Sequence, residues 1–220
     1  MRKIKGLLLT GLFALLSTVA FTSFAAGLSA PQQVIQDTSD LLYKIISEDK
    51  DKLSDRKYIL KLVDDVIEPR VDLEKISRIV IGKYWRKAPD EQKAQFQKEF
   101  KGLLVNTYAT AFTEFDEWTI HFLPMSVDAK GIRAIVKTEI IQPSRPPIAV
   151  NYRMAKNKEG VWRVYDVIIE GISLVTNYRS SFAKSIKKNG GLGNVIKALA
   201  EKNRRSETSA LAQERTKTNS

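Results

Sequence analysis

The chain has 220 residues, a formal net charge of +11, 43% hydrophobic residues and 28% charged residues. This composition is typical of a globular protein rather than of a disordered or collagen-like one. The absence of cysteine excludes disulfides, zinc–cysteine sites, iron–sulfur clusters and thiol nucleophiles. The one histidine, His121, leaves little for a histidine-based metal site or a catalytic triad. We therefore expect a protein that is not an enzyme and uses no cofactor or metal.

The N-terminus has the three-part layout of a secretory signal peptide. Residues 1–5 form a basic segment, residues 6–24 form an apolar run, and Ser23 and Ala25 are small residues at positions −3 and −1 of a cleavage site. We expect a signal peptide over residues 1–25 and an exported mature chain. An uncleaved membrane anchor is the alternative.

The mature chain stays basic after this cleavage, which removes three of the 36 basic residues and none of the 25 acidic ones. Outside the cytoplasm the abundant anionic surfaces are phospholipids and envelope glycolipids. These surfaces attract basic patches by electrostatics. We therefore expect no nucleic-acid partner. The alternative explanation of the surplus positive charge is that it serves solubility alone.

Apolar residues recur at helical spacing over four segments of the first half of the chain. Asp55 and Asp72 stand at N-cap positions, Gly82 ends the third segment, and Pro89 opens the longest one, whose apolar stripe continues to Phe115. The predicted helices cover residues 31–47, 54–69, 72–82 and 89–115.

Strict alternation of apolar and polar residues then predicts four strands, separated by short turns that favour an antiparallel meander. The predicted strands cover residues 118–122, 132–140, 148–154 and 161–169. Helical spacing returns after Gly171. The order predicts an α+β fold, with N-terminal and C-terminal helices packed on one face of a curved four-stranded antiparallel sheet.

The domain organisation follows from where the periodic pattern ends. A last amphipathic helix follows the glycine-rich break at residues 190–193, and from Asn203 the residues are polar and non-periodic. We expect a single domain over residues 26–203 and a disordered polar tail over residues 204–220.

Catalytic motifs in the chain are incomplete. Ser181 and Lys184 match a serine–x–x–lysine motif, but the other motifs of that enzyme class are missing. His121 alternates with apolar neighbours and is expected on the outer side of its strand. A hydrolase that uses a carboxylate such as Asp166 is the least supported hypothesis.

The apolar stripe of the 89–115 helix and the inner face of the predicted sheet can pack in either of two ways. They can form a solid core, or they can stand apart and enclose an apolar cavity lined by aromatic residues. Periodicity does not distinguish these two arrangements.

Four motifs follow one another between residues 81 and 179 of the mature chain. They are IGKYWR at residues 81–86, a Pro89-led helix with Phe96 and Phe100, RPP at residues 145–147, and YDVIIEGISLVTNYR at residues 165–179. Together with the signal peptide they resemble the MlaC family, the periplasmic phospholipid carriers of the Mla system, also called toluene-tolerance proteins.

The resemblance implies an NTF2-like cone that holds phospholipid acyl chains in an internal cavity and leaves the headgroup outside. It also implies a periplasmic carrier that passes lipid between an outer-membrane lipoprotein–porin complex and an inner-membrane MCE-domain complex with its ABC transporter. Such a carrier maintains the lipid asymmetry of the outer membrane, and we expect it to be a monomer.

On this hypothesis the acyl chains contact the long helix, the inner face of the sheet and the joint after Gly171. The expected lipid-binding residues are Leu104, Tyr108, Phe112, Ile120, Ala134, Val136, Ile148, Val150, Tyr152, Val167, Ile169 and Ile172. The cations expected to contact the headgroup or a partner are Arg86, Lys87, Arg145 and Arg179.

The competing hypothesis is a solid-core adaptor whose basic surface binds acidic envelope partners. It predicts an association that weakens with salt, and no internal ligand.

Overall fold

The computed structural model describes residues 27–108 and 117–218, with side chains up to residue 209. The expected signal peptide (residues 1–25) and Phe112 lie outside the described residues. Within them the chain is a mixed α+β fold of helices and one antiparallel sheet.

Capping residues set the limits of the N-terminal helices, as the sequence predicts. The Asp55 carboxylate accepts a hydrogen bond from the backbone N–H of Lys57, and Asp72 does the same for Lys75. Gly82 ends its helix with a positive φ of 53°. These helices are α1 (Ala30–Glu48), α2 (Arg56–Leu62), α3 (Leu73–Ile81) and α4 (Asp90–Tyr108).

The chain between α2 and α3 is irregular and connects the helices to the sheet. A π-helical turn (Val63–Ile67) follows α2, and a 3-10 turn (Glu68–Arg70) contains Pro69, which cannot continue the helix. Val71 then forms a parallel β-bridge with Val164. We call residues 63–71 the connecting segment.

The sheet has six strands, so the prediction of four was wrong in number. The four predicted strands are present in antiparallel order, and β2 and β6 add two residues each. Segments of two residues are too short for alternation to reveal. The strands are β1 (Thr119–Phe122), β2 (Ser126–Val127), β3 (Arg133–Ile141), β4 (Ile148–Lys156), β5 (Trp162–Ile169) and β6 (Ile172–Ser173).

The register assigns side chains to the two faces of the sheet. Val136 pairs with Tyr152, and Tyr152 with Val167, so these three share one face. A β-bulge follows Arg153, whose partner is Asp166 on the opposite face.

The C-terminal helices are α6 (Leu174–Lys188) and α7 (Leu192–Thr218). The backbone is helical up to Thr218, whereas the sequence predicted a disordered polar tail from residue 204. Residues 204–218 contain neither glycine nor proline, so little opposes helix formation there. Asn203 also holds α7 against α4, donating to the Glu99 carbonyl at 2.9 Å and accepting from Asn106 Nδ2 at 3.0 Å.

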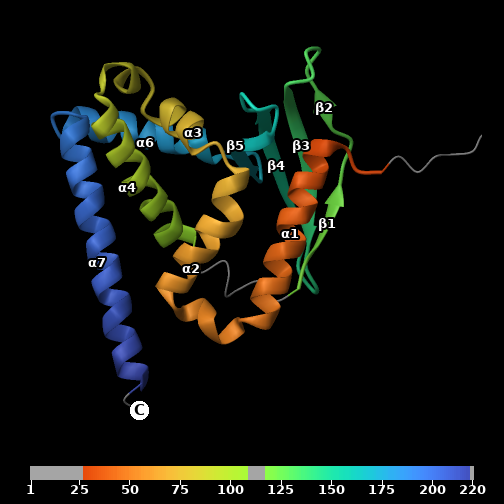
Figure 1. Ribbon diagram of the computed structural model, residues 1–220, viewed down its shortest axis with the longest axis horizontal. Coiled ribbons are helices and arrows are strands. Elements are labelled where there is room, and N and C mark those ends of the chain that lie inside the picture. The colour runs from red at the N-terminus through yellow and green to blue at the C-terminus, as the bar shows by residue number, and fades with distance from the viewer. Residues whose placement is uncertain (1–26, 109–116, 219–220) are drawn as a thin grey trace, which may run out of the picture.

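Buried apolar residues of the described chain form three clusters, and Val71 of the connecting segment packs against two of them. Phe96 and Phe100 of α4 contact Phe182 of α6 edge-to-face, within a core that also holds α3 and α7 residues. A separate cluster joins Ile35 of α1 to Met154 of β4. Figure 1 shows the four helices α3, α4, α6 and α7 on one side and the sheet with α1 on the other.

The start of α6 is fastened to the sheet by one buried carboxylate. Asp166 is 3% exposed and accepts hydrogen bonds from Arg153 Nη1 (3.0 Å), Ser173 Oγ (2.7 Å) and the Val175 N–H (3.1 Å). A buried charge is tolerated only when its partners are in place. Asp166 therefore joins β4, β5 and the first turn of α6.

Replacing this carboxylate should destabilise the fold. Asp166→Ala leaves the Val175 N–H and the Ser173 hydroxyl without their acceptor, and we expect the free energy of unfolding to fall by about 2–4 kcal/mol. Urea denaturation followed by circular dichroism measures this loss. The matched control is Asp65→Ala, which removes the exposed carboxylate that pairs with Lys61 and should leave the midpoint unchanged. Equal midpoints for the two variants would contradict this role of Asp166.

Candidate functional site

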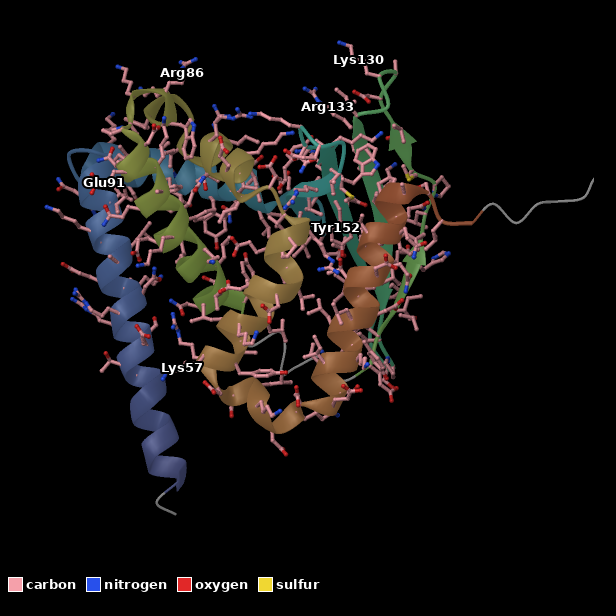
Figure 2. The ribbon with its side chains drawn as sticks, in the orientation of Figure 1. Lys57, Arg86, Glu91, Lys130, Arg133 and Tyr152 are labelled. Atoms are coloured by element: carbon pink, nitrogen blue, oxygen red, sulfur yellow. The ribbon has the colours of Figure 1, made fainter. Side chains whose placement is uncertain are left out.

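An apolar cavity of about 350 Å³ lies between α1 and the sheet, a size typical of small-molecule sites. We call it the α1 cavity. In Figure 2 the labelled Tyr152 lies between α1 and the connecting segment. The described residues that line the cavity are Val34, Ile35, Thr38, Ser39, Leu42, Ile46, Ile67, Arg70, Val71, Trp118, Ile120, Ile140, Tyr152, Val164 and Val167.

The polar side chains of α1 that reach this cavity already have partners. Thr38 Oγ1 donates to the Val34 carbonyl at 2.5 Å, and Ser39 Oγ accepts from Trp118 Nε1 at 2.8 Å. Satisfied hydroxyl groups require no water, so the α1 side of the cavity behaves as an apolar surface.

A second cavity, of about 240 Å³, lies between the connecting segment and α4, and we call it the α4 cavity. Ile67 and Val71 line both cavities and so form the partition between them. The other described lining residues are Val63, Glu68, Leu73, Lys101, Leu104, Val105 and Tyr108. Lys101 Nζ pairs with Asp64 at 3.0 Å and with Glu68 at 2.8 Å, so its charge is compensated.

A wider and more polar groove of about 700 Å³ adjoins the α1 cavity along β1, and we call it the β1 groove. It shares Ser39, Trp118 and Ile120 with the α1 cavity. Asp40 and Glu117 are its charged lining residues within the described chain, so the groove favours cations or neutral groups over anions.

Two tyrosines at the cavities have perturbed acidities. Burial raises the pKa of Tyr152 to about 12. Burial and a side-chain hydrogen bond with Tyr178 raise the pKa of Tyr108 to about 12. Both phenols stay neutral at physiological pH, so neither supplies a charge or a base to the cavity.

The predicted lipid-binding residues fall into several groups. Ile120, Tyr152 and Val167 line the α1 cavity, whereas Leu104 and Tyr108 line the α4 cavity. The others in the described chain line neither cavity: Ala134, Val136 and Val150 are buried, Ile148 and Ile169 are partly buried, and Ile172 is 62% exposed. Phe112 lies outside the described residues.

The four predicted headgroup or partner cations are all exposed, and none of them lines either cavity. Arg86 lies at the end of the molecule that also presents Lys130 and Arg133 (Figure 2). Lys87, Arg145 and Arg179 are the other three. Their contacts with a headgroup or partner stay predictions.

The sequence did not reveal that α1 and the connecting segment line the cavities. The sequence identified the apolar stripe of the 31–47 helix but assigned none of its residues to lipid binding, and it placed the cavity between the 89–115 helix and the sheet. Most of the α4 stripe packs against α3, α6 and α7. Thr38 and Ser39, which interrupt the α1 stripe, were the available signal that this helix does not pack tightly along its length.

Within the described chain, the side chains considered above for catalysis lie away from both cavities. Asp166 lines neither of them and is engaged in its three hydrogen bonds. Ser181 and Lys184 are exposed on α6. In residues 27–108 and 117–209 no cluster of histidine and acidic side chains is placed to hold a metal ion. No helix within the described chain is long and apolar enough to cross a membrane.

The MlaC protein family model matches residues 36–201, which includes α1 from Gln36 onwards, the connecting segment and the whole sheet. The chain belongs to the MlaC family. Other members include the toluene tolerance protein Ttg2D of Pseudomonas putida, 31% identical over 182 residues, covering 82% of this chain and 83% of the relative. The intermembrane phospholipid transport system binding protein MlaC of Haemophilus influenzae is 27% identical over 178 residues, covering 80% and 83%.

The fold of this MlaC-family chain is also found among solved structures. One of them is a phospholipid-binding protein from Ralstonia solanacearum in complex with a phospholipid, with a TM-score of 0.75 and 31% identity. The match covers 81% of this chain and 99% of the solved chain.

The raised pKa of Tyr152 predicts a pH dependence. Because unfolded tyrosines ionise near pH 10, stability is fully retained below that pH and falls as the pH rises towards 12, where folded Tyr152 ionises. Tyr152→Phe should remove one late-titrating phenol from the alkaline absorbance titration. Loss of a phenol that ionises near pH 10 would contradict the burial of Tyr152.

Proposed function

We propose that this chain is a carrier that binds phospholipid acyl chains in the α1 and α4 cavities and leaves the lipid chemically unchanged. The observation that carries the proposal is an apolar cavity between α1 and the sheet, in a fold that it shares with a phospholipid-binding protein in complex with a phospholipid. Of the expected contacts, the proposal rests on Ile120, Tyr152 and Val167 in the α1 cavity and on Leu104 and Tyr108 in the α4 cavity.

The physical role of such a cavity is to make extraction from a membrane nearly neutral in free energy. Burial of acyl chains stabilises a lipid in the bilayer by about 0.8 kcal/mol per methylene, or roughly 20 kcal/mol or more for two chains. A carrier compensates for the loss of this stabilisation only if its own interior excludes water equally well. The satisfied hydroxyls of Thr38 and Ser39 meet this requirement in the α1 wall.

The remaining elements of the proposal concern location and partners. The N-terminal pattern supports export to the periplasm, and the family supports exchange with an outer-membrane lipoprotein–porin complex and an inner-membrane MCE-domain transporter. The carrier would thereby maintain the lipid asymmetry of the outer membrane. An NTF2-like cone with the headgroup outside belongs to the same proposal.

Native mass spectrometry of the protein purified from a bacterial periplasm tests the proposal. We expect a population whose mass exceeds that of the polypeptide by one or more phospholipids, identifiable after organic extraction. Only the unliganded mass, with no extractable lipid, would favour the solid-core adaptor instead.

A cavity-filling substitution tests the position of the ligand. Val167→Phe adds volume inside the α1 cavity, and we expect it to reduce the lipid-bound fraction at least tenfold with an unchanged circular dichroism spectrum.

The matched control for this variant is Val161→Phe. Val161 is 49% exposed and lines neither cavity, so this variant should retain lipid as the wild type does. Equal lipid content in the Val167→Phe and Val161→Phe proteins would contradict the assignment of the α1 cavity.

A further inference from the structure

The connecting segment separates the α1 cavity from the α4 cavity. Ile67 and Val71 contribute to both walls, and Arg70 lies between them in the sequence and lines the α1 cavity. A lipid with one acyl chain in each cavity would have its branch point, the glycerol phosphate, at this partition. Arg70 is therefore placed where the chains of such a lipid diverge.

Arg70 is the one charged side chain among the described residues that line the α1 cavity. Its Nη1 donates to the Val66 carbonyl at 2.7 Å. No carboxylate in the described part of the chain pairs with it. A guanidinium has five N–H donors, so Arg70 retains donors for a ligand in a setting of low polarity, where a charge-assisted bond is strong.

The other charged groups that line the cavities and the β1 groove are less suited than Arg70 to binding an anion. Lys101 in the α4 cavity is already paired with Asp64 and Glu68. The β1 groove carries Asp40 and Glu117, which repel an anion. An anionic group at either cavity is therefore drawn towards Arg70.

We propose that Arg70 binds the phosphate of a two-chain glycerophospholipid whose acyl chains enter the α1 and α4 cavities on either side of Ile67 and Val71. This proposal rests on the proposed function. The planar guanidinium matches two phosphate oxygens, which an ammonium group does not. The contact makes the site selective for phospholipid over diacylglycerol, a neutral lipid with the same chains but no phosphate.

The test offers the purified protein vesicles with equal amounts of phosphatidylglycerol and diacylglycerol carrying the same acyl chains. The bound ratio of the two lipids is read by native mass spectrometry. We expect the wild type to favour the phospholipid and Arg70→Met to lower that ratio about tenfold or more. Arg70→Lys, which keeps the charge but not the planar fork, should give an intermediate ratio.

The matched control is Arg78→Met, which removes an exposed cation of α3 that lines neither cavity and should keep the wild-type ratio. If Arg70→Met and the wild type bind both lipids in the same ratio, the assignment of Arg70 is overturned while the carrier function stands. If the wild type binds neither lipid, the proposed function falls and the Arg70 proposal falls with it.

Discussion

The separation between α1 and the sheet is the feature on which the rest of the structure depends. A helix in an α+β domain ordinarily buries its apolar stripe directly against its sheet. Here Val34 and Leu42 line a cavity of about 350 Å³ whose opposite wall includes Ile120 and Val167. Walls that stand apart in this way make fewer packing contacts with each other than a solid core does, and hydrocarbon between them would supply such contacts.

The contacts at the two ends of α1 explain why the helix stays apart from the sheet between them. Ile35 near its start belongs to a cluster with Met154 of the sheet, and Ile46 near its end belongs to a different cluster with Leu53 and Ile59. The helix is thus anchored at both ends to separate bodies. The core of α3, α4, α6 and α7 is joined to the sheet through the hydrogen bonds of Asp166.

Sequence periodicity predicted most of the helices and strands, but little about which of them pack against each other. The caps at Asp55 and Asp72 and the four long strands followed from local chemistry, because N-caps and alternation depend on neighbouring residues. A stripe shows which face of a helix is apolar but not what that face meets. The α4 stripe accordingly divides between two environments, because Leu104 and Tyr108 line the α4 cavity whereas Phe96 and Phe100 pack against α6.

Three features could not have been read from the chain. Strands of two residues give no alternation, and the polar sequence after Asn203 does not reveal that hydrogen bonds to α4 hold α7 in place. In the sequence, Arg70 follows Pro69 and is one of many basic residues, so nothing there distinguishes it from the others. Its position in an apolar wall depends on the π-helical and 3-10 turns of the connecting segment, which the 3.6-residue period does not predict.

The central claim is that hydrocarbon occupies the space between α1 and the sheet. A crystal structure of the protein purified from a periplasm without detergent tests it most directly. The account predicts elongated electron density in contact with Ile120, Tyr152 and Val167. A structure in which side chains fill that space, or in which lipid density lies elsewhere on the molecule, would contradict it.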